Sequence, residues 1–241
     1  MYSLILWWTM GVAMAAPVGD PVANPSTGRV HLDASMEVSR TAEVDLECAG
    51  SACGVVTYRE GFGVELGAAL LRGVGIYGLV VRAKDELKEA NFEGRTQVYG
   101  GGVRLALPVY RSLWVAGVGE VRFGQSESVQ SERLNDPPRA EERIHTASIL
   151  AVVGDPSNGG HLWLGAQGAW EWKHTVAPMG DDGVTVDIPL GPRVPVSGVL
   201  GGMVLSDPLG LPWRKSLRLR ASIEGRIGQE NGMRVVTGLA F

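Results

Sequence analysis

The 241-residue chain lacks several features that would assign it to a common class of protein. Only two cysteines are present, which excludes a miniprotein held by a disulfide framework and a zinc protein with four thiolate ligands. Basic residues are not in excess, since 22 Lys and Arg stand against 26 Asp and Glu, so nothing suggests binding to nucleic acid. Charged residues make up 20% of the chain and hydrophobic residues 45%, which excludes a disordered protein.

A long apolar run occurs only at the amino terminus. Residues 4–14 form an apolar run of eleven residues, and Ala13-Met14-Ala15 fits the small-x-small pattern of a cleavage site. Such a run is too short to span a bilayer, which takes about 20 residues. We therefore interpret 1–15 as a signal peptide for export. Residues 16–28 contain three prolines and two glycines, which predicts a flexible leader in the periplasm.

The rest of the chain alternates apolar and polar residues with a period of two, which is typical of β-strands. Between 29 and 47, for example, Leu32, Met36 and Val38 alternate with Asp33 and Glu37. We predict about ten strands, an even number as in single-chain bacterial barrels, with eight or twelve as alternatives. Their ranges are 29–47, 54–71, 73–84, 96–107, 112–124, 143–153, 161–173, 193–205, 216–228 and 232–241.

The connections between these strands alternate in length. Short turns are expected near 72 and at 108–111, 154–160 and 206–215, whereas 85–95, 125–142 and 174–192 are longer and polar. This asymmetry is typical of transmembrane barrels, and a soluble two-sheet sandwich, the alternative fold, has no need of it. The sequence thus predicts an all-β fold, a closed antiparallel up-and-down transmembrane β-barrel over 29–241.

The last strand carries a further pattern. Met233, Val235, Leu239 and Phe241 lie on one face of it, with Thr237 as a departure from the apolar alternation. With the signal at 1–15 and the alternation over 29–241, the chain resembles the small outer-membrane β-barrel family of Gram-negative bacteria. The resemblance implies a monomer in contact with outer-membrane lipid, whose final strand is the assembly signal read by the barrel-insertion machinery.

One face of each strand is expected to meet lipid and the other to line the lumen. Aromatic residues at the two membrane interfaces are expected at Phe62, Tyr99, Phe123, Trp170, Trp172 and Trp213. Glycine is abundant, with 34 residues, and such residues can mark barrel corners or leave room in a narrow lumen.

Many charged residues fall on the polar face, and we expect them in the lumen. The basic ones are Arg82, Lys84, Arg104, Arg122, Lys173, Arg218, Arg220, Arg226 and Arg234, and the acidic ones are Asp33, Glu37, Glu65, Glu120, Glu171 and Glu224. A ten-stranded barrel is little wider than an eight-stranded one, whose interior side chains can fill it. The charges therefore predict a network of ion pairs across the lumen, with a constriction that prefers anions as the alternative.

Motifs for catalysis are absent from the sequence. Outer-membrane acyl hydrolases carry His-x-Ser and outer-membrane proteases carry Asp-x-His, and neither spacing occurs here. His31 and Asp33 share a face, which favours a lumen pair over a catalytic dyad. We predict no catalytic residues, cofactor or metal, and a structural or surface-interaction role through extracellular loops whose partner the sequence does not identify. The alternatives are a narrow channel for small solutes, anions among them, and a hydrolase at the outer rim.

We predict a disulfide between Cys48 and Cys53, which are separated by four residues at the tip of the first hairpin. An exported protein meets an oxidising compartment, and the closed loop contributes roughly 2 kcal/mol by chain-entropy reasoning. Mass analysis of the exported protein without reductant is expected to find both thiols blocked against alkylation. Two alkylatable thiols would contradict the pairing.

Overall fold

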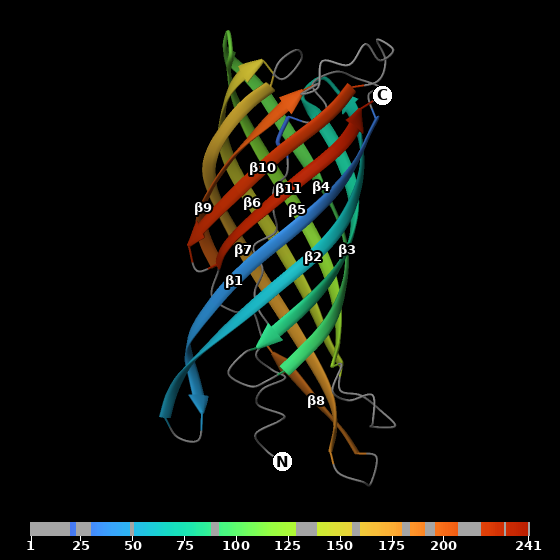
Figure 1. The fold of residues 1–241 in the computed structure, drawn as a ribbon, viewed down its shortest axis with the longest axis vertical. Coiled ribbons are helices and arrows are strands. Elements are labelled where there is room, and N and C mark those ends of the chain that lie inside the picture. The colour runs from blue at the N-terminus through green and yellow to red at the C-terminus, as the bar shows by residue number, and fades with distance from the viewer. Residues whose placement is uncertain are drawn as a thin grey trace.

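The computed structural model describes residues 20–22, 30–48, 51–87, 92–128, 139–155, 160–179, 184–190, 196–206, 218–228 and 230–240. Eleven strands account for nearly all of them (Figure 1). They are β1 (Val30–Cys48), β2 (Ser51–Leu71), β3 (Val74–Leu87), β4 (Phe92–Tyr110), β5 (Leu113–Ser128), β6 (Arg139–Asp155), β7 (Gly160–Met179), β8 (Val184–Leu190), β9 (Val196–Ser206), β10 (Arg218–Gly228) and β11 (Glu230–Ala240). Within the described ranges, no helix is long and apolar enough to cross a membrane.

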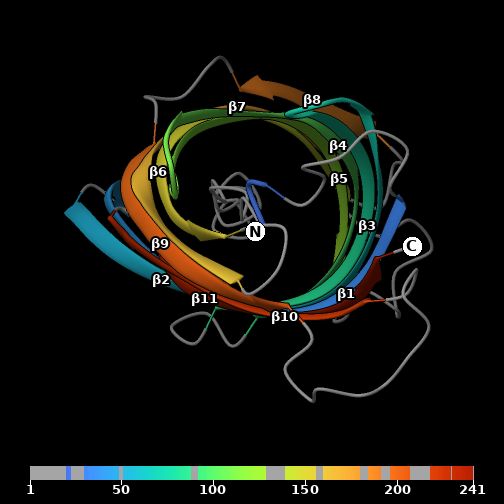
Figure 2. The ribbon, with the colours of Figure 1, turned by 90° about the horizontal axis from the view of Figure 1, so that it is seen from above.

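Ten of these strands form a closed antiparallel barrel, as predicted (Figure 2). The order around the ring is β6-β5-β4-β3-β2-β1-β11-β10-β9-β7, and β6 pairs with β7 to close it. The first strand therefore lies beside the last, with Met36 opposite Val235 and Val38 opposite Met233. Closure leaves the ring without a free edge strand, which a spanning sheet requires.

The eleventh strand was not predicted. β8 pairs only with the far end of β7, from Lys173–Leu190 to Met179–Val184, and lies outside the ring. It falls inside 174–192, where a long polar connection was expected. Val184, Val186 and Ile188 alternate with Thr185 and Asp187, so a short period-two signal was present there.

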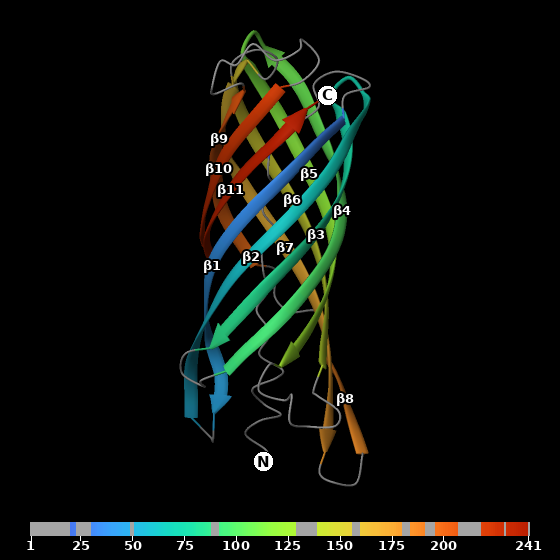
Figure 3. The same ribbon diagram turned by 45° about the vertical axis from the view of Figure 1, so that its right-hand side comes forward.

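The two ends of the barrel differ as the connection lengths indicated. The turns 72–73 and 111–112 are tight and lie at one end, whereas the β1–β2 and β7–β8 hairpins project beyond the ring at the other end (Figures 1 and 3). Gly73 adopts a φ of 78° in its turn, and a Cβ there would lie 2.2 Å from the Ala106 carbonyl oxygen. Glycine is therefore required at the β2–β3 turn.

The hairpin tip contains both cysteines. Cys48 pairs in register with Ser51, and Leu46 pairs with Cys53. The side chains of Cys48 and Cys53 lie outside the described part of the chain, so their disulfide stays a prediction.

The barrel has an apolar outer face and a largely polar inner face. Leu66, Val103, Ile149 and Leu164 are among the many large apolar side chains on the outside, with exposed fractions between 44% and 66%. His31, by contrast, faces inward and is fully buried. A water-soluble protein has the opposite distribution, and so broad an apolar surface is stable only against hydrocarbon or another apolar partner.

Two strands whose facing the sequence left undecided are now assigned. In β6, Ile144, Leu150 and Val152 face inward, while Ile149 and Val153 face outward. In β9, Val204 faces inward, whereas Val199, Met203 and Leu205 face outward. Both faces are apolar in sequence because Leu150, Val152 and Val204 belong to an apolar cluster inside the barrel.

Most of the predicted interface aromatics and assembly-signal residues can be located. Phe62, Tyr99, Phe123 and Trp170 are exposed on the outer face, with the Arg143 guanidinium 5.4 Å from the centre of the Phe123 ring. Met233 and Val235 are also on that face, and Leu239 shares their phase. The side chain of Trp172, and all of Trp213 and Phe241, lie outside the described residues.

Candidate functional site

The lumen holds most of the charges that the sequence placed there. The following predicted residues are buried inside the barrel: Asp33, Glu37, Glu65, Arg104, Glu120, Arg122, Arg220, Glu224, Arg226 and Arg234. The side chains of Glu171, Lys173 and Arg218 lie outside the described part of the chain.

The prediction was wrong for Arg82, and for Lys84 beside it. Both are exposed on the outer face, because the inward face of β3 is the one that carries Tyr77 and Leu79. The sequence analysis assigned the more apolar face of β3 to lipid. That face instead packs inside the lumen, and the arginine and lysine alternate with it on the outside.

Glu65 is the most highly connected carboxylate in the lumen. Arg104 Nη1 and Nη2 donate to its two oxygens at 2.6 and 3.0 Å, and His31 Nε2 lies 2.9 Å from Oε1. Arg234 Nη2 stands 3.8 Å from Oε2. These partners come from β4, β1 and β11, so a single buried carboxylate on β2 ties together strands on both sides of β2. Paired, charge-assisted hydrogen bonds of this kind are the strong ones.

Further pairs extend this network. The Tyr77 hydroxyl donates to Glu120 at 2.6 Å, and the Arg104 guanidinium lies 3.8 Å from the centre of the Tyr77 ring. Arg122 pairs with Glu120. On the opposite side, Arg226 Nη2 lies 2.6 Å from Glu37 Oε1 on β1, and Glu37 neighbours β11 in register.

Four network residues toward the loop end, Arg59, Asp85, Thr96 and Glu142, were missed by sequence reasoning. Arg59 forms an ion pair with Asp85 and lies 3.6 Å from Glu142. The Thr96 hydroxyl donates to Asp85 at 2.5 Å. Arg59 has the same strand phase as Glu65, and Asp85 has the same phase as Tyr77, so counting by twos along β2 and β3 could have found both.

Glycines on neighbouring strands leave room for the buried side chains. A Cβ at Gly67 would lie 2.1 Å from His31 Cε1, and one at Gly238 would lie 1.8 Å from Asp33 Oδ1. Both distances are far below van der Waals contact, so no other residue fits there while the partner keeps its place.

A segment that is not part of any strand lies inside the barrel. Asp20, Pro21 and Val22 are buried, and the segment appears within the ring in Figure 2. Residues 16–28 were predicted to be a flexible leader in the periplasm, so this placement of residues 20–22 corrects that expectation. The segment is held inside the barrel by the carboxylate of Asp20, a residue that was not among the predicted lumen charges.

Asp20 is held by donors from two strands of the ring. His161 Nε2 on β7 donates to Oδ1 at 2.7 Å, and Arg220 Nη2 on β10 donates to Oδ2 at 2.7 Å. The Val22 backbone N–H also donates to Oδ1, at 2.9 Å. Burial by itself would raise the pKa of Asp20, but the charges of His161 and Arg220 outweigh it and hold the pKa well below its usual range.

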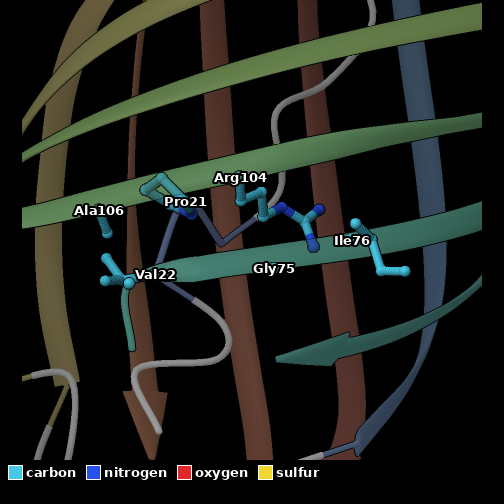
Figure 4. A pocket seen from close by; sticks show the side chains of 7 residues that line it. Pro21, Val22, Gly75, Ile76, Arg104 and Ala106 are labelled. Atoms are coloured by element: carbon cyan, nitrogen blue, oxygen red, sulfur yellow. The ribbon is translucent and has the colours of Figure 1, made fainter. Parts of the chain in front are cut away.

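Val22 joins an apolar cluster that fills the remaining wall of the lumen. Its other buried members are Tyr77, Leu79, Ala106, Ala116, Val118, Leu150, Val152, Trp163 and Val204. A small cavity separates the Asp20–Val22 segment from the barrel wall, lined by Pro21, Val22, Gly73, Gly75, Ile76, Arg104 and Ala106 (Figure 4). The described lumen is therefore packed with both charged pairs and apolar side chains.

The charge balance of the lumen differs from the expected basic excess. Among the described residues, six arginines and eight carboxylates are buried. The additional carboxylates are Asp20, Asp85 and Glu142. Arg82 and Lys84 do not count among the lumen charges, because they lie on the outer face. This balance gives no support to a constriction that prefers anions.

One cluster has the composition of a metal site. Ligand atoms of His31, Asp33 and Glu65 lie within 4.8 Å of one another. However, both Glu65 oxygens accept hydrogen bonds from Arg104, and Arg220 stands 3.7 Å from Asp33. Guanidinium groups thus already neutralise these carboxylates, and a metal ion would have to displace them.

We predict that the substitution Glu65→Gln weakens the barrel strongly. It leaves the buried Arg104 and Arg234 without the negative charge that compensates them, which costs about 3–5 kcal/mol. The matched control is Glu60→Gln, since Glu60 lies on the same strand but is exposed, where ion pairs contribute about 0–1 kcal/mol. The measurements are the temperature of the mobility shift in SDS gels and urea unfolding in lipid vesicles. Equal stability of the two variants would contradict the central role of Glu65.

Comparison with known proteins gives a fold but no family. No family model and no curated protein matches the chain. Among solved structures, it is similar to the translocator domain of the autotransporter NalP from Neisseria meningitidis, with 9% identity over 88% of this chain and 87% of that one and a TM-score of 0.57.

Two further likenesses are looser. The transport unit of the autotransporter AIDA-I from Escherichia coli gives a TM-score of 0.47 at 10% identity, covering 99% of this chain and 96% of that one. An outer-membrane channel from Pseudomonas putida F1 gives 0.48 at 11% identity, covering 94% and 99%. The NalP likeness shows that this chain has a fold found among outer-membrane β-barrels.

Proposed function

We propose that this protein is an integral outer-membrane β-barrel with a sealed lumen, which acts as a structural or surface-interaction protein through its long hairpins. The observation that carries this proposal is the filled lumen. Charged pairs, the apolar cluster and the Asp20–Val22 segment all occupy the space that a conducting pore would need. The apolar outer face supports contact with outer-membrane lipid.

The hairpins at the long-loop end are the parts suited to contact a partner. β2 has 21 residues and β7 has 20, whereas about 9–11 residues cross the hydrocarbon. Roughly half of each strand is therefore available outside the membrane on this proposal. In outer-membrane barrels the longer connections face the cell exterior.

The assembly of the barrel follows from the same proposal. A cleaved signal at 1–15 delivers the chain, and the β11 strand, which pairs with β1 to close the ring, is the element that the barrel-insertion machinery reads. The protein is proposed to act as a monomer, since the ring closes within one chain.

No catalytic role is part of the proposal. In the described part of the lumen, both histidines are engaged with carboxylates, His31 with Glu65 and His161 with Asp20. The histidine motifs of outer-membrane hydrolases are absent from the sequence.

A narrow channel for small solutes is the second candidate, and one observation favours it. Arg234 Nε and Nη1 and Arg220 Nη1 are buried and have no hydrogen-bond partner among the described residues. Buried guanidinium N–H groups need partners, and water molecules running through the lumen would supply them.

Conductance separates the two candidates. We expect the purified protein to leave a planar bilayer silent, because the packed lumen offers no continuous path for ions. As a control for correct folding, the same sample is tested for the shift in SDS-gel mobility on heating, which a folded barrel shows. Discrete current steps that scale with salt concentration would overturn the sealed lumen and establish the channel.

A further inference from the structure

We propose that Arg220 and His161 form a binding site for small carboxylates that carry a short apolar group, and that Asp20–Val22 is its tethered occupant. This goes beyond a sealed structural barrel, because it assigns a ligand class to one place in the lumen. It does not depend on whether the lumen conducts.

The donors of this site belong to the barrel itself. Arg220 is on β10 and His161 on β7, two strands that are separated in the ring by β9. Both side chains are buried, with exposed fractions of 7% and 4%, and both reach the same carboxylate at 2.7 Å. Strand pairing fixes these two residues whether or not the carboxylate is present.

The occupant, by contrast, is outside the sheet. Asp20, Pro21 and Val22 belong to no strand, and the side-chain hydrogen bonds that hold Asp20 to the barrel are those to Arg220 and His161. A segment anchored through one carboxylate and one apolar side chain behaves like a bound ligand on a tether. Its removal leaves a site whose donors remain in place.

The apolar half of the site defines the ligand class. Val22, 3% exposed, packs in the cluster that contains Trp163 and Val204. Trp163 follows His161 on the same face of β7, and Val204 pairs with His161 in register. A ligand that replaces the segment must therefore place a carboxylate on Arg220 and a short apolar tail against this wall.

The site has two nitrogen atoms without a hydrogen-bond partner among the described residues, and a small cavity lies beside it. Arg220 Nη1 and His161 Nδ1 have no hydrogen-bond partner in the described part of the chain. The small cavity beside Pro21 and Val22 reaches the β2–β3 turn at Gly73, on the short-turn side of the barrel (Figure 4).

The test is rescue of an Asp20→Ala variant by butyrate. Heat stability of the folded barrel is measured by the SDS-gel shift, with butyrate, acetate or butyramide added to the full-length protein. We expect D20A to unfold at a lower temperature than the wild type and butyrate to restore it. At ten times its dissociation constant, butyrate would shift the unfolding equilibrium by about 11-fold.

Two controls identify the groups that bind. Butyramide has nearly the same shape without the charge and is expected to give no rescue, and Arg220→Gln in the D20A background is expected to abolish rescue by butyrate. Acetate lacks two methylene groups and is expected to bind more weakly, by about fourfold for each methylene that is buried.

Several results would overturn the proposal. They are equal effects of butyrate and butyramide, rescue that persists in the double variant, or a D20A variant as stable as the wild type and indifferent to butyrate. If D20A does not refold alone, refolding yield becomes the readout, with the same order of ligands expected and equal yields counting against the site. If the wild-type protein conducts ions, the proposal of a sealed lumen fails, but the rescue result does not change. Failure of the sealed lumen and failure of the carboxylate site are therefore distinguishable.

Discussion

The constraint on which the structure depends is that a charge inside a narrow barrel must be paired. A buried guanidinium or carboxylate without a partner costs several kcal/mol, and the lumen of this barrel holds six of the first and eight of the second among its described residues. Glu65 shows how the constraint is met, because donors from three other strands converge on it. The same pairs that neutralise the charges also join strands that are not neighbours in the sheet, such as β2 with β4 and β11, and so help to fix the shape of the ring.

The rest of the lumen follows from this arrangement. Eight of the fourteen buried charges of the described residues lie on β1, β2, β10 and β11, whereas the apolar cluster, apart from Val22, comes from β3 to β7 and β9. The Asp20–Val22 segment matches both kinds of surface, with a carboxylate for the buried donors and a valine for the apolar cluster. The interior of the barrel is therefore packed with side chains like the core of a folded domain. The outer surface carries the apolar residues that lipid requires.

The number and order of the strands in the ring and most of the lumen charges could be predicted from the sequence, because a period of two is a local property. Which face of β3 lines the lumen could not be predicted, because Tyr77 and Leu79 look like lipid-facing residues until the opposite wall of the lumen is known. Asp20 illustrates a second limit. Its partner Arg220 is 200 positions away, and only closure of the ring brings them together. β8 was missed because its alternation covers only seven residues with a proline among them.

Aqueous access to the middle of the lumen tests the central claim most directly. Ala116 on β5 faces inward and is fully buried, while Ser112 in the adjacent turn is exposed. With Cys48 and Cys53 replaced by serine, the variants Ala116→Cys and Ser112→Cys are treated with a membrane-impermeant thiol reagent in the folded state. The account predicts rapid labelling at 112 and none at 116 until the barrel is unfolded. Labelling of both at similar rates would show a water-filled lumen and contradict it.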